Sequence, residues 1–218
     1  MPLSRTKLVA LIFVLVGIGI YGTWALWVTT RTERPVNIPM VMAIGHIRTR
    51  EFKLNMNVPY SIGVEVQKEK IPFDTLNCLL GLSTALKSTE LQECPDKPSV
   101  LKASWVLTSN GQAVAHGSSD DYRGGAWMND SISRELGHFE GQSGRRYVLD
   151  VNVLADGSSL NSGNPRLKVQ VYPGVYEGNI FNDIILLLVS AVLVLVGAAL
   201  LIVSFVRNSS RPPSSLNS

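Results

Sequence analysis

Hydrophobic positions in this chain form two long uninterrupted runs near its ends and several short alternating stretches between them. Residues 8–28 are 21 residues without a charge, and residues 184–206 are 23 residues of mostly Leu, Val and Ile. At about 1.5 Å per residue, a helix of either length would cross the roughly 30 Å hydrocarbon core of a bilayer. The pattern predicts two transmembrane helices with one domain, residues 29–183, inserted between them.

The first run begins like a signal peptide, because Arg5 and Lys7 precede an apolar core. That core is longer than the about 7 to 15 residues of a signal h-region, and no small-x-small cleavage site follows it. Trp24 and Trp27 stand near its end instead, which is typical of anchors at a membrane interface. The pattern favours an uncleaved signal anchor, with a cleaved signal peptide as the alternative.

The flanks of the two runs predict the orientation. The tails, residues 1–7 and 207–218, each carry two basic residues and no acidic one. Positively charged flanks stay in the cytoplasm. Arg31 and Arg34 lie on the other side of the first run, but they open a long segment, and long segments are translocated largely regardless of charge. We therefore expect an integral protein of the plasma or inner membrane with cytoplasmic termini and an extracytoplasmic central domain.

The net charge of +3 belongs to these tails. Without their four basic residues, the remaining 16 Lys and Arg stand against 17 Asp and Glu, so the central domain is nearly neutral. A neutral domain gives no reason to expect nucleic acid as a partner. The expected partners are the lipid bilayer and a membrane or envelope protein, and formation of a homo-oligomer stays open.

Period-2 alternation of apolar and polar residues marks the central segments as half-buried strands. Pro59 interrupts the first pair of strands, and Asn110-Gly111 favours a tight type I′ hairpin between two others. Short strands punctuated by Gly, Ser, Asn and Pro predict a mainly β fold, an antiparallel β-sandwich that resembles immunoglobulin-like or jelly-roll domains without their signature residues. The predicted inward-facing positions are Phe52, Leu54, Met56, Val58, Ile62, Val64, Val66, Leu101, Ala103, Trp105, Leu107, Tyr147, Leu149, Val151, Val153, Leu167, Val169 and Val171.

One stretch departs from the strand pattern, because Leu76, Leu80 and their neighbours recur near helical spacing and predict a short helix. Cys78 and Cys94 bracket it. In an extracytoplasmic domain they are expected to form a disulfide, whose loop of about 15 residues would stabilise the fold by ~3 kcal/mol. Two buried free thiols are the alternative, and a metal site would need further ligands.

No catalytic residue, metal ligand or cofactor motif emerges from the sequence. The three histidines are scattered, and nothing resembles G-x-S-x-G, H-E-x-x-H or a Walker loop. We therefore expect a protein that is not an enzyme and holds no cofactor.

The stretch "HGSSDDYRGGAWMNDS", residues 116–131, is predicted to be a long loop at one end of the sandwich, and loops of this length are often functional. Its aromatic residues could stack on a sugar ring or a partner while its charged residues supply polar contacts. The alternative is that the tryptophan caps the core and the charges are merely solvated. The binding candidates are Asp120, Asp121, Tyr122, Arg123 and Trp127.

Small residues form a stripe on the second apolar run, where Ser190, Gly197 and Ser204 recur every seven residues. Gly17 offers a matching position in the first run. Such stripes let helices approach closely, so we expect the two spans to pair within the chain, unless the spacing is chance.

Three function classes fit these features. The favoured one is a membrane-anchored, non-catalytic binding or assembly module whose extracytoplasmic domain contacts a protein or envelope component, including as an accessory subunit of a membrane complex. The second is a signal-relay protein that acts through helix partners. The third is an envelope glycan- or lipid-processing enzyme, for which Asp120, Asp121 and His116 would be the acid and base groups.

Overall fold

The structure is a computed structural model that describes residues 5–82, 99–122, 124–128 and 130–209; for residues 127, 176–180 and 207–209 it describes the backbone only. The chain forms two compact units. One is Thr32–Val175, and the other combines Met1–Arg31 with Tyr176–Ser218.

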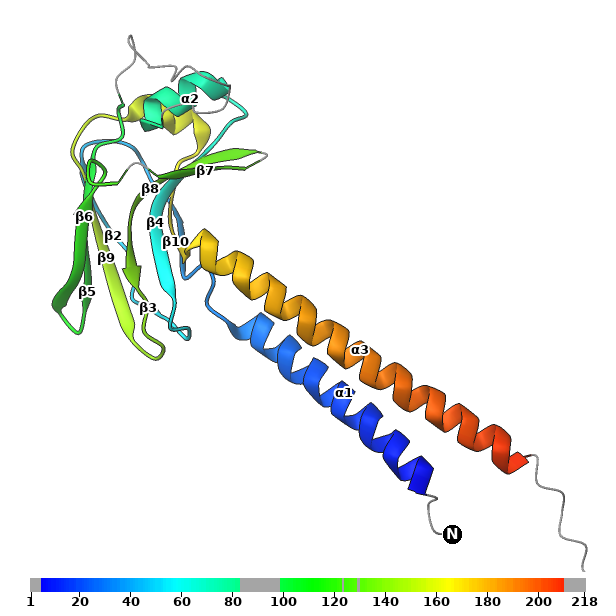
Figure 1. The fold of residues 1–218 in the computed structure, drawn as a ribbon. Coiled ribbons are helices and arrows are strands. Elements are labelled where there is room, and N and C mark those ends of the chain that lie inside the picture. Colours follow the sequence, from blue (N-terminus) through cyan, green and yellow to red (C-terminus); the bar gives the residue numbers. More distant parts are fainter. Residues whose placement is uncertain (1–4, 83–98, 123, 129, 210–218) are drawn as a thin grey trace, which may run out of the picture. The chain divides into compact units, whose positions relative to one another are not determined.

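The first unit is mainly β and contains two antiparallel sheets (Figure 1). Sheet A has the strand order β1-β10-β4-β8-β7, and sheet B has the order β2-β9-β5-β6 with β3 also paired to β9. This confirms the predicted mainly β class. The strands are β1 (Val36–Pro39), β2 (Gly45–Arg48), β3 (Phe52–Lys53), β4 (Pro59–Gln67), β5 (Ala103–Ser109), β6 (Gln112–Ser118), β7 (Gly125–Trp127), β8 (Ser131–Glu140), β9 (Arg146–Val153) and β10 (Arg166–Val171).

Buried residues from both sheets form one hydrophobic core, the arrangement expected where two sheets pack face to face. Burial alternates along β5 and β9, because successive strand residues point to opposite faces. All the predicted inward-facing positions are buried except Val58, which is partly buried against the core. The period-2 pattern thus located these core positions correctly, whereas the core residues of β8, Ile132, Leu136 and Phe139, were not predicted.

The hairpin predicted at Asn110-Gly111 is confirmed. β5 and β6 pair antiparallel up to Ser109 and Gln112, and the two residues between them have φ angles of 52° and 76°. Positive φ at both central positions is the requirement of a type I′ turn.

The strand predicted over residues 52–58 is wrong for most of its length, since β3 ends at Lys53. Leu54 and Met56 are still buried, but the backbone N–H of Asn55 donates to Thr32 Oγ1 at 3.0 Å instead of joining a ladder. Pro59 is also no break between strands. It is the first residue of β4, a position where its missing N–H costs no ladder bond.

Two further elements refine the predictions. The short helix is present as α2 (Phe73–Leu80), although residues 83–98 lie outside the described part of the chain. The stretch 116–131 is not one long loop, because β6 continues to Ser118 and the short strand β7 pairs with β8. A three-residue strand that begins at a glycine carries no alternation for sequence analysis to find. A 3-10 helix, η1 (Ser158–Gly163), precedes β10.

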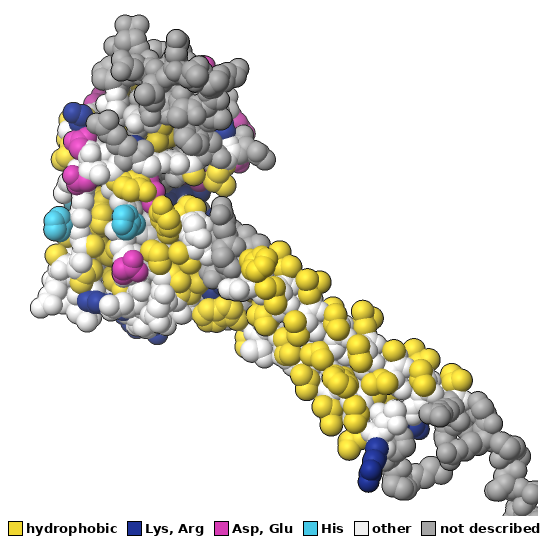
Figure 2. All heavy atoms as spheres, in the orientation of Figure 1, with side chains coloured by type: hydrophobic (Ala, Val, Ile, Leu, Met, Phe, Trp, Pro, Cys, Tyr) yellow, Lys and Arg dark blue, Asp and Glu magenta, His cyan; other side chains and the backbone are white. Residues whose placement is uncertain are grey.

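The second unit is a pair of long apolar helices, α1 (Arg5–Thr30) and α3 (Pro173–Ser209), of which α3 begins in the β unit. Both are long and apolar enough to cross a membrane. They lie antiparallel, because Gly17 contacts Ser190 near the middle of α1 while Lys7, near its start, lies over the ring of Phe205 near the end of α3. Hydrophobic side chains cover much of their visible surface (Figure 2).

Candidate functional site

The outer face of sheet A, the face turned away from the core, carries a cluster of polar side chains. Because β4 alternates, Tyr60, Ile62 and Val64 enter the core while Ser61 and Glu65 point outward. Neighbouring strands add Ser133 and Glu135 from β8 and Lys168 and Gln170 from β10. The sheet's strand order therefore brings together residues that lie up to 109 positions apart in the sequence, as the Ser61–Gln170 contact shows.

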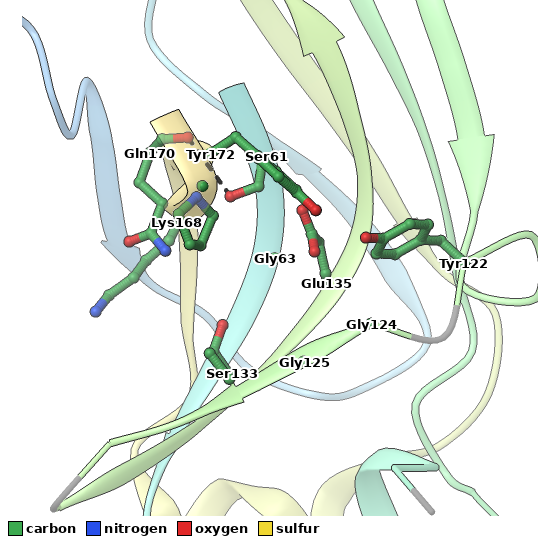
Figure 3. A pocket seen from close by; sticks show the side chains of 13 residues that line it. Ser61, Gly63, Tyr122, Gly124, Gly125, Ser133, Glu135, Lys168, Gln170 and Tyr172 are labelled. Atoms are coloured by element: carbon green, nitrogen blue, oxygen red, sulfur yellow. Dashed lines mark hydrogen bonds between the residues drawn. The ribbon is translucent and has the colours of Figure 1, made fainter. Parts of the chain in front are cut away.

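A cavity of about 300 Å³ lies on this face (Figure 3). Two glycines, Gly63 and Gly125, are among its lining residues. Neither position has room for a side chain, because a Cβ on Gly63 would lie 2.8 Å from the backbone oxygen of Arg134, and a Cβ on Gly125 would lie 2.5 Å from Leu82 Cδ2. Tyr122, from the segment that leads into β7, and Tyr172, from the end of β10, provide aromatic side walls.

Glu135 is the acidic group of the cavity. Its burial raises the pKa of the carboxyl above the usual range, while a hydrogen bond from Tyr122 and the charges of His138 and Arg134 lower the pKa by less. The Oε1 atom is buried and accepts no hydrogen bond from the described part of the chain. In Figure 3 the hydroxyls of Tyr122 and Tyr172 point toward this carboxyl. Glu135 is thus a partly desolvated acceptor.

The two tyrosines belong to the same electrostatic cluster. A hydrogen bond with Tyr172 and the nearby Glu135 carboxyl raise the pKa of Tyr122 to about 12, so its phenol keeps its proton and acts as a donor. The exposed ring of His138 lies 5.8 Å from that of Tyr122 and 6.3 Å from that of Tyr172. The two tyrosine rings that line the cavity beside Glu135 thus contact a third, exposed ring that is not part of its lining.

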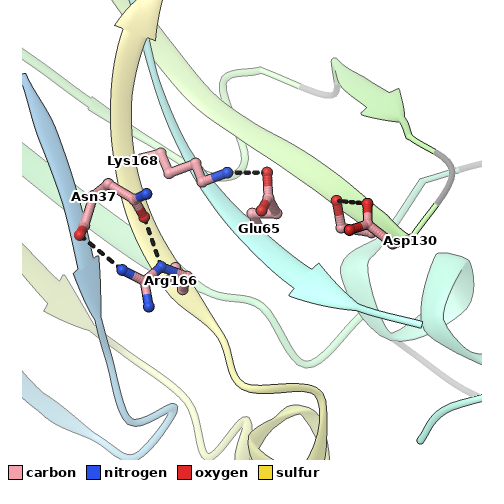
Figure 4. Close-up of polar contacts among 6 residues, drawn as sticks. Asn37, Glu65, Asp130, Arg166 and Lys168 are labelled. Carbon is pink, nitrogen blue, oxygen red and sulfur yellow. Dashed lines mark hydrogen bonds and ion pairs between the residues drawn. The ribbon is translucent and has the colours of Figure 1, made fainter. Parts of the chain in front are cut away.

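An ion pair borders the cavity on the other side. The ammonium group of Lys168 contacts the carboxylate of Glu65, and both side chains are mostly buried (Figure 4). Next to it, the Arg166 guanidinium donates to the side-chain and backbone oxygens of Asn37 at 2.6 and 2.9 Å. The charge of Lys168 is thus compensated within the sheet.

Of the binding candidates in residues 116–131 whose side chains the structure describes, only Tyr122 lines the cavity. Asp120 and Asp121 form an exposed turn after β6, where Asp121 Oδ2 accepts the backbone N–H of Ser118 at 2.9 Å. Arg123 lies outside the described residues, and Trp127 is in β7 with its side chain not described. Neither aspartate lines the cavity, and the carboxylate of Asp121 is bonded within the turn.

The other predicted site residues are the two cysteines and the small residues of the apolar helices. Cys78 lies in α2, but Cys94 lies outside the described residues, so their disulfide stays a prediction. Ser190 donates its hydroxyl to the backbone oxygen of Gly17 at 2.8 Å.

Gly197 packs closely as well, because a Cβ on it would lie 2.8 Å from the backbone oxygen of Ala10. Ser204 is half-buried on α3.

Sequence analysis missed Glu135, Tyr172 and Lys168. Lys168 and Tyr172 lie in and next to β10, whose inward-facing positions were predicted, so the outward position of Lys168 was available from the alternation. No inward-facing position was predicted for β8, which carries Glu135. What no local signal shows is that β4 lies between these strands and joins their polar faces into one site.

The raised pKa of Glu135 predicts a dependence of stability on pH. The folded chain holds this proton to higher pH than the unfolded chain, so stability falls as pH rises from the ordinary glutamate pKa to the raised value. Glu135→Gln removes this cost and keeps an acceptor. We expect the difference in melting temperature between this variant and the parent to increase by about 1 to 3 °C from pH 4 to pH 7 in favour of the variant, measured by circular dichroism.

The matched control is Glu140→Gln, an exposed position at the end of the same strand. Its melting temperature relative to the parent should not depend on pH. An equal pH response in both variants would contradict the assignment of the effect to the buried carboxyl.

Comparisons with known proteins add little to this geometry. No protein-family model and no curated protein matches the chain. Among solved structures, the crystal structure of a Sulfurospirillum deleyianum protein is similar with a TM-score of 0.42 and 10% sequence identity, over 63% of this chain and 97% of that chain. At this level of similarity, function has to be inferred from the chain's own residues.

Proposed function

We propose that this protein is a membrane-anchored, non-catalytic binding module. Its two helices span the plasma or inner membrane, both termini are cytoplasmic, and the β unit is an extracytoplasmic sandwich of immunoglobulin-like or jelly-roll type. The cavity on sheet A contacts a protein or envelope component. A disulfide between Cys78 and Cys94 suits an oxidising compartment.

The surface of the helix pair carries this proposal. The residues buried in the pair are small, such as Ala10, Gly17 and Ser190. Large apolar side chains face outward instead, with exposed fractions of 66% for Leu26 and 68% for Leu195. Proteins in water rarely expose contiguous apolar surfaces of this extent, whereas membrane helices bury small residues against each other and turn large ones to lipid.

Anchoring is tested by extraction and labelling. In membranes of expressing cells, the protein should resist alkaline carbonate extraction. An impermeant maleimide applied from outside should label a cysteine at Ser158, which is exposed in the β unit, and spare one at Thr6, which is exposed in the first turn of α1. Release by carbonate, or labelling of Thr6→Cys alone, would refute the proposal.

Binding is tested by crosslinking in cells followed by purification in detergent. Tyr122→Ala opens one wall of the cavity and should reduce partner recovery, whereas Asp120→Ala alters the exposed turn and should not. Equal recovery with both variants would show that the cavity is not the contact.

One observation favours a second candidate, an envelope hydrolase or transferase. A half-buried carboxyl with a raised pKa beside a tyrosine in a cavity is also typical of a general acid. The acid would be Glu135 and not the aspartates of the turn. Turnover of an envelope glycan that Glu135→Gln abolishes and Glu140→Gln leaves intact would favour this candidate over the binding module.

A further inference from the structure

We propose that the cavity on sheet A binds a primary ammonium group on a slender aliphatic stem, as a lysine side chain of a protein partner presents it, with Glu135 as the anionic acceptor. The inference rests on the proposed binding function and names its ligand chemistry.

The first argument is the state of the Glu135 carboxyl. Oε1 is buried and accepts no hydrogen bond from the described residues. A buried acceptor without a donor costs free energy, and a cationic N–H donor is the group that relieves both the missing bond and the cost of burying negative charge. Oε1 is therefore the one oxygen of this carboxyl that is shown to need a donor.

That single oxygen favours ammonium over guanidinium. A guanidinium group binds a carboxylate best as a planar fork that uses both oxygens. An ammonium group is a compact point charge with three donors, so it can use one carboxylate oxygen and place its other N–H groups on neighbouring hydroxyls. The hydroxyls of Tyr122 and Tyr172 lie around the carboxyl and suit that role (Figure 3).

The walls fit a cation as well. Tyr122 and Tyr172 both line the cavity, and a cation near aromatic faces is attracted by the ring quadrupole. Gly63 of β4 lines the cavity, is paired with Glu135 in the strand register and has no side chain to fill the space beside that carboxyl. A slender alkyl stem would lie in this space with its ammonium group at the carboxyl.

The neighbouring charges leave Glu135 available. Lys168 of β10 is paired with Glu65 of β4. Arg134 precedes Glu135 on β8, points to the opposite face and donates to the backbone oxygen of Ser119 at 2.9 Å. His138 stands beside the two tyrosines. Among the described residues that line the cavity, Glu135 is therefore the only one with a carboxyl, and it has no ion-pair partner among them.

The test uses the full-length protein in lipid nanodiscs and the probe Nα-acetyl-lysine N-methylamide, titrated at about pH 8, which is well above the ordinary pKa of a carboxyl group. Isothermal titration calorimetry should show saturable binding at about millimolar concentration, typical of a small fragment. The acetyl-norleucine analogue, which has the stem but no ammonium group, should not bind.

Variants assign the binding to the carboxyl. Glu135→Gln should lower the affinity about tenfold or more, Glu135→Asp should have an intermediate effect because its reach is shorter, and Glu140→Gln should have none. Melting curves of each variant establish that it is folded. Unchanged affinity in folded Glu135→Gln would overturn the proposal.

The remaining probes distinguish ligand sources. Tetramethylammonium carries charge without N–H donors and should bind more weakly than the lysine probe. If ethanolamine phosphate binds more tightly than the lysine probe, the ligand would be a lipid headgroup and not a protein side chain. If methyl glucoside or the norleucine analogue binds and the lysine probe does not, the cavity would not be an ammonium site. If no amine binds while carbonate extraction and labelling succeed, this inference fails and the anchored binding module stands.

Discussion

Replacing Trp105 with alanine is expected to lower the free energy of unfolding of the β unit by about 3 to 5 kcal/mol. Trp105 lies in β5 of sheet B and is only 3% exposed. Its indole Nε1–H donates to the backbone oxygen of Leu136 in sheet A at 2.9 Å, inside the core. Alanine would remove the largest side chain at this contact between sheets and leave a cavity. It would also leave a buried carbonyl without its hydrogen-bond donor.

The packing of this indole depends on two neighbouring glycines. A Cβ on Gly117 would lie 2.9 Å from its Cζ2 atom, and a Cβ on Gly137 would lie 2.6 Å from the same atom. The indole thus lies between two bare backbone positions, one on β6 and one on β8. Gly137→Ala should therefore also destabilise the unit, since its φ of 154° is unfavourable for a side chain as well.

The measurement is urea denaturation followed by far-UV circular dichroism, which does not depend on the removed fluorophore. Val106→Ala is the matched control, because Val106 is the next residue of β5 and is 36% exposed on the opposite face. Its loss should stay below about 1 kcal/mol. A similar loss in both variants would contradict a special role for the buried indole.

Substitution of Gly17 or Gly197 by leucine is expected to separate α1 from α3. A Cβ on Gly17 would lie 2.7 Å from Val194 Cγ2 and 3.0 Å from the backbone oxygen of Ser190. A leucine cannot fit without moving the helices apart, which would also break the hydrogen bond from the Ser190 hydroxyl to Gly17. We expect each substitution to weaken the pairing by about 1 to 3 kcal/mol.

Spin labels at Leu8 and Ile202, both exposed on the helix surfaces, would report the separation by pulsed electron paramagnetic resonance in nanodiscs. The parent should give a short, narrow distance distribution, and either leucine variant a longer or broader one. Gly19→Leu is the control, because no atom lies within 4 Å of a Cβ at Gly19. An unchanged distribution in Gly17→Leu would refute close packing at this glycine.

Hydrophobic periodicity was sufficient for much of the fold. An uninterrupted apolar run of about 18 residues or more indicates a helix long enough to cross a membrane, and period-2 alternation indicates the buried face of a strand. The prediction failed over residues 54–58, where buried side chains alternate although the backbone bonds to Thr32 and to the β8–β9 connection. Burial depends on where the side chains point, whereas a strand is defined by the backbone hydrogen bonds of its ladder. A segment can therefore have alternating buried side chains without being a strand.

The sequence by itself thus determined the two apolar helices, the mainly β unit, the inward-facing residues of most of its long strands and the turn at Asn110-Gly111, because each depends on residues close together in the chain. Only the tertiary structure decided the cavity. Glu135, Tyr172 and Tyr122 meet there because β4 lies between β8 and β10 and β7 adds to the edge. Strand order is a long-range property that depends on how the whole core packs, so no local pattern could place these three side chains around one carboxyl.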